Sequence, residues 1–313
     1  MKFYNKHIFN TIFYILLLSF ILQGCIEDVK DTNLPSIEQK LVVSSFITPG
    51  DSIRVKISKS TPIHYNQELT NWDDYYEPLT NASVFITNIE TGVSKEIPFN
   101  SAKEYYLLTP SEFMIEKGQE YMLTASAVGL KSITAKTSIP LGTPQIQCLS
   151  IDTIYTESQD FEDSNAYEYF DLVVSGYVVD IPNEKNYYTI GAQIKEEFYS
   201  FWEDTTYMFY FFRSGASFTD SDNDGKDIPF KSDIYLNENS TYSLVLLSSD
   251  EHYYRYHKSF YNWNSENPFS EPTPLYSNSD GGLGIFASVV IINVNNTEKT
   301  NLIFSDYLCR HKR

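Results

Sequence analysis

IRVKIS, residues 53–58, shows the pattern that decides the fold. Its three apolar residues occupy every second position, so an extended chain would place all of them on one face. Other runs rich in strand-forming residues lie at 41–46, 84–86, 93–99, 121–127 and 132–137. Turn signals such as Pro49-Gly50-Asp51 separate them, and none has a helical period. Residues 40–140 are therefore predicted to form one β-sandwich domain, immunoglobulin-like or transthyretin-like.

The second half of the chain is also predicted to be β-rich. Residues 139–144 contain two prolines and a glycine, which suit a domain linker better than a helix or a central strand. Strand-like runs follow at 169–179, 187–198, 207–212, 241–247 and 285–294. We expect a second domain over residues 145–308, either a β-sandwich or a barrel-like sheet. The sequence does not choose between the two.

One helix is predicted in this half, from about Ser249 to Tyr261. Ser248 followed by Glu251 has the spacing of a capping box. Aromatic residues then recur at spacings of three and four, which places them on one helical face. They are Tyr253, Tyr256, Phe260 and Trp263. The whole chain is thus expected to be all-β, with one short helix.

The N-terminus has the order of an export signal. Lys2 and Lys6 precede an apolar run, Ile12–Leu22, that is too short to cross a bilayer as a helix. Gly24 and Cys25 follow. This order resembles the bacterial lipoprotein signal, in which the cysteine thiol carries a diacylglycerol and begins the mature chain. We expect a signal peptide over residues 1–24, lipidation of Cys25, and a flexible tether over residues 25–39.

Acidic residues directly after Cys25 indicate a destination. Glu27 and Asp28 resemble the surface-export signal of Bacteroidetes lipoproteins, which face the outside of the outer membrane. The alternative is a solvated tether that happens to be acidic. The expected location is the outer membrane, with the protein held by its lipid and exposed on the cell surface.

Charge and cysteine content limit the partners. The formal net charge is −18, which repels nucleic acid and anionic headgroups, although exported proteins also use acidic surfaces for solubility. Cys148 and Cys309 remain after lipidation of Cys25. In an exported chain they either form a disulfide or stay as two buried thiols.

DSDNDG, residues 220–225, is the sharpest local motif. Asp220, Asp222 and Asp224 stand at the first, third and fifth positions of a calcium loop, and a glycine follows. Lys231 occupies the position of the closing glutamate, for which Asp227 or Asp233 would have to substitute. The alternative is an acidic hairpin tip, because Asn-Asp-Gly is itself a turn signal. Calcium is therefore a possible cofactor, and no other is indicated.

Enzyme motifs are not found in the sequence. It lacks a Gly-x-Ser-x-Gly elbow, a His-Glu-x-x-His pair and a glycine-rich phosphate loop. The histidines are scattered, and His252 and His257 diverge on the expected helix. The chain is accordingly predicted not to be an enzyme.

Several segments together resemble a known family. The most specific is the closing run, which contains NPFSEP (residues 267–272), YSN (276–278) and GGLGIF (281–286). The chain is similar to a large Bacteroidetes family of outer-membrane lipoproteins described only as a domain of unknown function. The resemblance implies a gene beside a TonB-dependent receptor of the SusC-like kind. It implies a role as accessory or ligand-binding partner in nutrient uptake, with an unknown ligand. The alternative is a calcium-stabilised surface adhesin or structural lipoprotein without a transport partner.

Overall fold

The structure is a computed structural model. It describes residues 38–60, 77–156, 169–195, 208–211, 217–221, 223–237, 241–261 and 274–295. The chain divides into two units, Met1–Glu38 and Gln39–Arg313, and all strands and helices named below belong to the second. Within the described residues, no helix combines the length and the apolar character that a membrane span requires.

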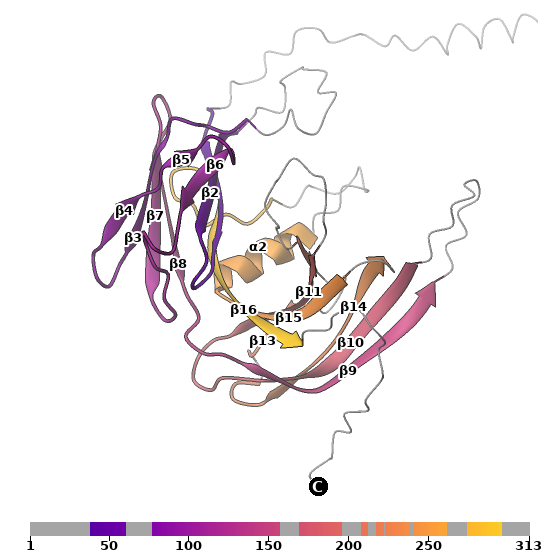
Figure 1. The fold of residues 1–313 in the computed structure, drawn as a ribbon. Coiled ribbons are helices and arrows are strands. Elements are labelled where there is room, and N and C mark those ends of the chain that lie inside the picture. Colours follow the sequence, from indigo (N-terminus) through magenta and orange to yellow (C-terminus); the bar gives the residue numbers. More distant parts are fainter. Residues whose placement is uncertain are drawn as a thin grey trace, which may run out of the picture. The chain divides into compact units, whose positions relative to one another are not determined.

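The first half builds two facing sheets. Its strands are β1 (Leu41–Ile47), β2 (Ile53–Lys59), β3 (Ser83–Asn88), β4 (Ser94–Glu96), β5 (Phe99–Asn100), β6 (Tyr105–Leu108), β7 (Glu120–Ser126) and β8 (Ile133–Ser138). One sheet has the order β4-β3-β7-β8, and the other contains β1-β2-β6-β5. In β2 the apolar residues are buried and the polar residues between them are not, as the IRVKIS pattern predicts. The two inner faces share one apolar core, so the predicted sandwich is confirmed (Figure 1).

The second half adds two further sheets and a helix. Its elements are β9 (Gln145–Thr156), β10 (Tyr169–Val179), β11 (Tyr187–Lys195), β12 (Met208–Phe211), β13 (Ser217–Thr219), β14 (Asp227–Asn237), β15 (Thr241–Ser249), α2 (Glu251–Tyr261) and β16 (Leu283–Asn295). Strands β14-β10-β9 form a three-stranded sheet that packs on β11 and β15. The described strands do not close into a barrel. Of the two predicted alternatives, a β-sandwich and a barrel-like sheet, the structure agrees with the β-sandwich.

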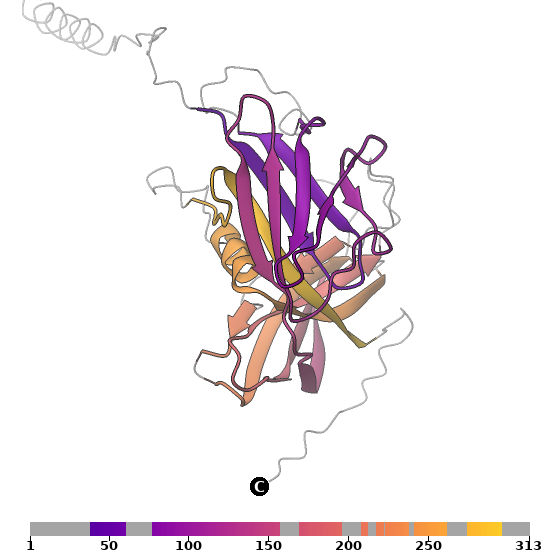
Figure 2. The ribbon, with the colours of Figure 1, turned by 90° about the vertical axis from the view of Figure 1, so that its left-hand side faces the viewer.

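Strand β16 joins the two halves. Its first part pairs with β1 in parallel, with Ser45 opposite Phe286, and its second part pairs with β15 in antiparallel fashion. A nine-stranded sheet therefore runs through both halves. Phe286 and Val290 enter the core of the first sandwich, while Ile285 and Val289 face the helix on the opposite side. Figures 1 and 2 show β16, in yellow, running from the strands of the first half to those of the second.

The predicted domain boundary between residues 140 and 145 stays a prediction. The boundary separates the elements by their order along the chain and not by their position in space. In space, a strand more than 100 residues beyond it completes the first sandwich.

GGLGIF, residues 281–286, is the crossing point into β16. Gly284 has φ of +106°, and a Cβ atom there would lie 1.9 Å from the carbonyl oxygen of Val43. Only glycine allows both this conformation and this close approach of two backbones. The Asn278 side chain fixes the same crossing, because its amide donates to the carbonyls of Lys136 and Phe286. The motif therefore has a structural role in the chain path.

Helix α2 packs on the face of the nine-stranded sheet that is opposite the first core. Its Tyr253 is buried against Phe46 of β1, with ring centroids 5.3 Å apart. The predicted capping box is wrong in its first residue. Asp250 caps the helix, since its Oδ1 accepts from the Tyr253 backbone at 2.8 Å, whereas Ser248 still belongs to β15. Trp263 lies outside the described residues.

Candidate metal centre

Three aspartates meet where strands of the second half end. Asp180 follows the last residue of β10, Asp220 follows the last residue of β13, and Asp224 lies in the turn before β14. Strand β13 pairs with β11, and β14 pairs with β10, so these two pairings bring the three strand ends together. The site is thus assembled from two segments that are separated by about 40 residues of chain.

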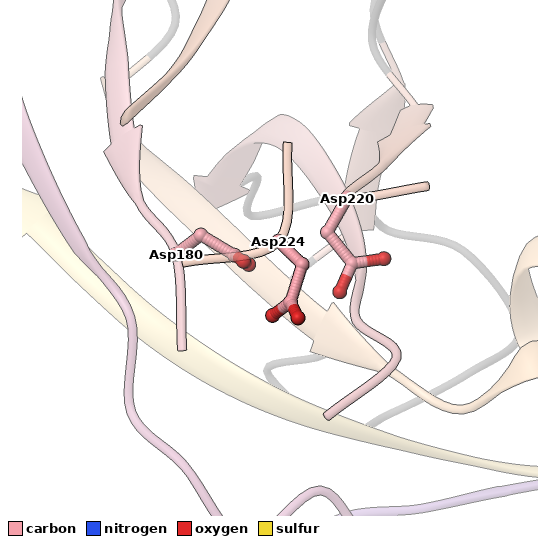
Figure 3. Close-up of side chains that lie close together, drawn as sticks. All are labelled: Asp180, Asp220 and Asp224. Carbon is pink, nitrogen blue, oxygen red and sulfur yellow. The ribbon is translucent and has the colours of Figure 1, made fainter. Parts of the chain in front are cut away.

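The three carboxylates converge. One oxygen of each lies within 4.8 Å of the others. Figure 3 shows the side chains pointing toward one another from their separate segments. Asp180 and Asp220 are buried, at 6% and 3% exposure, while Asp224 is exposed. The cluster therefore has a buried floor and an open side.

Backbone amides hold the carboxylates in place. Asp180 Oδ2 accepts from the Gly225 backbone, Asp220 Oδ2 from the Asn186 backbone, and Asp224 Oδ1 from the Asn183 backbone, each at 2.8 Å. Each bond crosses between the residue 180–186 segment and the residue 220–225 turn. The two segments are therefore tied to each other through the aspartates.

Two bonds from side chains reach the other oxygen of Asp180. The Tyr188 hydroxyl donates to Oδ1 at 2.7 Å, and the Asn186 amide, turned to its satisfied orientation, donates to the same atom at 3.2 Å. Burial raises the pKa of Tyr188, and its bond to Asp180 raises it further. Tyr188 thus stays a neutral donor at any physiological pH.

The electrostatics of the cluster favour a cation. Burial raises the pKa of Asp220, and the nearby Asp180 and Asp224 carboxylates raise it further against the opposing effect of the Asn186 amide. Buried carboxylates this close repel each other unless a proton or a cation lies between them. Carboxylate oxygens are the ligands that calcium and magnesium prefer. The donor set therefore fits a hard divalent cation, with Asp180, Asp220 and Asp224 as its ligands.

The sequence predicted part of this set. Asp220 and Asp224 converge as expected, and Asp222 lies outside the described residues. Asp227, one of the predicted substitutes, is instead the first residue of β14, opposite Val179, and does not belong to the cluster. Lys231 and Asp233 also lie in β14. Strands flank the loop where an EF-hand would have helices, so the site is not an EF-hand.

Asp180 was missed by the sequence analysis. It stands 40 positions before Asp220, and the calcium-loop pattern searches only within one loop. One local signal was present: an aspartate directly after a strand and two residues before Pro182-Asn183, a turn-forming pair.

Cys148 lies apart from the cluster, in edge strand β9. It has φ of +54°, and the β9–β10 register shifts between Ser175 and Tyr177 beside it, as at a β-bulge. Cys148 is disulfide-bonded. The chain has three cysteines, so the partner is Cys25 or Cys309, both outside the described residues.

Comparison with known proteins places the chain in a family. A model of the family described as Domain of unknown function (DUF4249) matches residues 27–291. No curated protein matches the sequence. The matched region contains every described strand of the first half, the aspartate cluster and all but the end of β16. The chain therefore belongs to the DUF4249 family of domains of unknown function.

Proposed function

We propose that the protein is a lipid-anchored protein of the outer-membrane surface. In this proposal it works without catalysis, as the accessory or ligand-binding partner of a TonB-dependent receptor in nutrient uptake. The observation that carries the proposal is the N-terminal order of Lys2 and Lys6, the apolar run Ile12–Leu22, and Gly24-Cys25 followed by Glu27 and Asp28.

Two observations support export and anchoring. Cys148 is disulfide-bonded, and disulfides persist in oxidising compartments such as the periplasm and the cell surface. The family match begins at residue 27, two positions after the cysteine that would become the mature N-terminus. Two or more acyl chains on Cys25 suffice for stable anchoring, because each buried methylene contributes about 0.8 kcal/mol.

Labelling and affinity capture in the source bacterium test this proposal. Cys25→Ser should abolish incorporation of labelled palmitate and release the protein from the membrane fraction. External protease should digest the unaltered protein on intact cells, and affinity capture from solubilised outer membrane should recover a TonB-dependent receptor. A protein that faces the periplasm and captures no receptor would contradict the proposal.

The aspartate cluster supports a second candidate function. We propose that Asp180, Asp220 and Asp224 bind calcium and thereby brace the second half of a surface adhesin or structural lipoprotein. Three converging carboxylates, two of them buried, are the observation that favours it. The ion would join the residue 180–186 segment to the residue 220–225 turn.

Calorimetry with calcium chloride on the chain from residue 26, which lacks the lipid, tests the calcium proposal. Calcium binding should release heat and raise the melting temperature, and Asp220→Asn should remove both effects. Asp227→Asn is the matched control, because Asp227 is exposed and lies outside the cluster. Two results would contradict the calcium proposal: no heat of binding at millimolar calcium, or the same loss of heat and of melting-temperature rise in Asp220→Asn and Asp227→Asn. Neither result bears on the proposed lipid anchor.

A further inference from the structure

Strand β9 is a long edge strand, and its outer edge has no partner strand among the described residues. It covers Gln145–Thr156 and pairs with β10 at one side of the sheet β14-β10-β9. The backbone N–H and C=O groups on its other side are therefore open to a further strand. Proteins usually cover or shorten such edges, because a long open edge pairs with other chains.

The disulfide of Cys148 shows that another segment reaches this strand. Cys148 lies in β9 with φ of +54°, beside the register shift between Ser175 and Tyr177, and a bulge of this kind re-aims a side chain. The cysteine is disulfide-bonded, and its partner is Cys25 or Cys309. The bond therefore ties β9 to a part of the chain outside the described residues.

Position favours Cys309 as the partner. Strand β16 ends at Asn295, and its Val294 packs on the same apolar cluster as Leu149, the residue after Cys148. Cys309 follows Asn295 by 14 residues. A chain of that length reaches up to roughly 46 Å, so Cys309 starts close to β9 and has ample chain to meet it.

Cys25 is placed less favourably. It precedes β1, which pairs with the opposite end of β16: Val42 lies opposite Leu283. Leu283 is about 36 Å along the strand from Val294, the residue that shares the β9 cluster. Cys25 would thus need an almost fully extended tether to reach Cys148, and the proposed lipid on its thiol would exclude the bond altogether.

Residues 301–308, NLIFSDYL, have the composition of a strand and directly precede Cys309. A pairing of Cys309 with Cys148 sets which residues lie opposite one another. In antiparallel order, residues 301–308 lie along residues 156–149, up to the last residue of β9. In parallel order only residues 306–308 would lie beside β9, because the strand begins at Gln145. Antiparallel pairing therefore covers most of the open edge.

The apolar pattern agrees with this register. Leu149 packs on the core of the second half, and the strand period of two assigns positions 151, 153 and 155 to the same face. Val174, which lies opposite position 151, is buried. The residues that would join this face are Leu308, Asp306, Phe304 and Leu302. Three of these four are apolar, as the edge of a packed sheet requires.

Charge agrees with the same direction. Residues 310–313, RHKR, would lie beside the start of β9. There Gln145 lies opposite Val179, and Val179 lies opposite Asp227, so this is the end of the sheet that holds the aspartate cluster. Among the described residues, segments 180–186 and 220–227 contain five carboxylates and two lysines. The three basic residues of RHKR would lie about 10 Å from this acidic end, two strand spacings away.

The path of the chain permits the pairing. Asn295 lies opposite Leu244 of β15, and β15 begins four residues after β14 ends at Asn237. Asn237 and Thr156 both lie opposite Tyr169. Strand β16 therefore ends where β9 also ends, and residues 296–300 can connect the two with a reach of roughly 20 Å.

We infer that residues 301–308 form a further strand on the outer edge of β9, antiparallel to it and fixed by a Cys148–Cys309 disulfide. The occupant of the open edge is thus a segment of this same chain. This inference goes beyond the proposed function and requires neither a receptor nor calcium. It gives the three-stranded sheet a covered edge and brings RHKR toward the aspartate cluster.

Disulfide mapping and hydrogen exchange of the full chain test the inference. Peptide mapping without reduction should recover Cys148 joined to Cys309. In the unaltered protein, residues 149–156 should exchange slowly, including the alternate amides that point away from β10. Phe304→Asp places a charge on the core side and should accelerate these alternate amides at least about tenfold. Ser305→Asp is the matched control, because position 305 would lie on the outer face, and it should leave exchange unchanged.

The other outcomes overturn the inference. Fast exchange of the alternate amides in the unaltered protein would show that the edge is open. Equal acceleration by both variants would show that the segment does not pair in this register. Slow exchange that Phe304→Asp leaves unchanged would show another occupant, and a doubled mass in analytical ultracentrifugation would identify it as a second copy. A Cys25–Cys148 peptide would refute the proposed lipid anchor as well, whereas failure of the exchange test alone leaves the anchor standing.

Discussion

The two halves of the chain differ more in charge than in architecture. Residues 39–144 contain 11 acidic and 9 basic residues, whereas residues 145–313 contain 26 acidic and 11 basic ones. Both halves pack sheet on sheet around an apolar core. The net charge of −18 therefore belongs almost entirely to the second half, and it does not describe the surface of the first. A charge calculated for a whole chain can therefore conceal a half that is nearly neutral.

The halves also differ in whether they are complete. The second half supplies its own strands, while the first takes its last core strand from β16. The following predictions test whether the two halves unfold independently or as one cooperative unit.

Gly284→Ala should have the largest effect. The new Cβ would overlap the Val43 carbonyl, 1.9 Å away, at a φ of +106° that alanine avoids. We expect a loss of about 3 kcal/mol or more in the free energy of unfolding, measured by denaturant titration. Hydrogen exchange should accelerate in both halves, because β16 serves both.

Gly92→Ala is the control for this substitution. Gly92 also has a positive φ, of +70°, but no atom lies within 4 Å of its Cβ position. It should cost only about 1 kcal/mol. Accelerated exchange in one half alone after Gly284→Ala would show that the halves fold independently.

Cys148→Ser should have the next largest effect. Loss of a native disulfide costs about 2–4 kcal/mol, and the exchange of β9 and β10 should rise before that of the first sandwich. If Cys309 is the partner, Cys309→Ser reproduces the loss and Cys25→Ser leaves the stability unchanged. Peptide mapping without reduction identifies the bonded pair, and a Cys25–Cys148 peptide would refute lipidation of Cys25.

Asp250→Ala should cost about 1–2 kcal/mol at neutral pH, through loss of the helix cap. The variant also loses the Thr137 hydroxyl bond to Asp250 Oδ2, at 2.5 Å, which connects β8 to α2. Asp250→Asn retains one acceptor oxygen for the Tyr253 backbone amide, and its NH2 group can donate to the Thr137 hydroxyl, so it should cost less. Equal losses would show that the charge of Asp250, and not its hydrogen bonds, stabilises this contact.

Acid titration distinguishes the charge of Asp250 from its hydrogen bonds. Burial raises the pKa of Asp250 to about 6, so its contribution to stability is largest at low pH and is lost as pH rises toward 6. Burial lowers the pKa of His257 to about 4, so its contribution is lost as pH falls from 6.5 toward 4. On acidification of the unaltered protein, the Asp250 contribution to stability rises while the His257 contribution falls. Asp250→Asn should therefore lose stability more steeply on acidification, and a parallel pH profile would contradict these assignments.

Added salt should have the smallest effect. Sodium chloride at about 0.5 M screens the self-repulsion of the second half and should slow its hydrogen exchange slightly, with a gain below about 1 kcal/mol. The first half, with nearly balanced charge, should not respond. An equal response in both halves would show that charge asymmetry has no energetic consequence.

Local pattern was sufficient to predict most individual elements. The alternation in residues 53–58 matches the burial of β2, and the helix expected from Ser249 to Tyr261 begins only two residues later than predicted. The helix cap was wrong because Ser248 and Asp250 are both good caps, and only the length of β15 decides between them. Strand β9 was not predicted, since its second half overlaps the start of the acid-rich stretch from Asp152 to Asp171.

Contacts between distant residues could not be predicted in this way. The pairing of Val43 with Gly284 joins positions 241 residues apart, and Asp180 meets Asp220 across three intervening strands. Neither the hydrophobic period of a segment nor the spacing of residues within a motif reveals contacts between distant parts of the chain. The glycines of residues 281–284 indicated a close backbone approach, but they did not identify the strand that would approach.

The place of β16 in the sequence sets an order of events for folding. The first sandwich is synthesised early, yet the strand that pairs with β1 comes almost last, so a growing chain leaves one edge of β1 unpaired and part of its core open. The core of the first sandwich can therefore be completed only after nearly all of the chain has been made. If the chain is exported before folding, as proposed above, the topology itself delays completion of the first core until export is nearly finished.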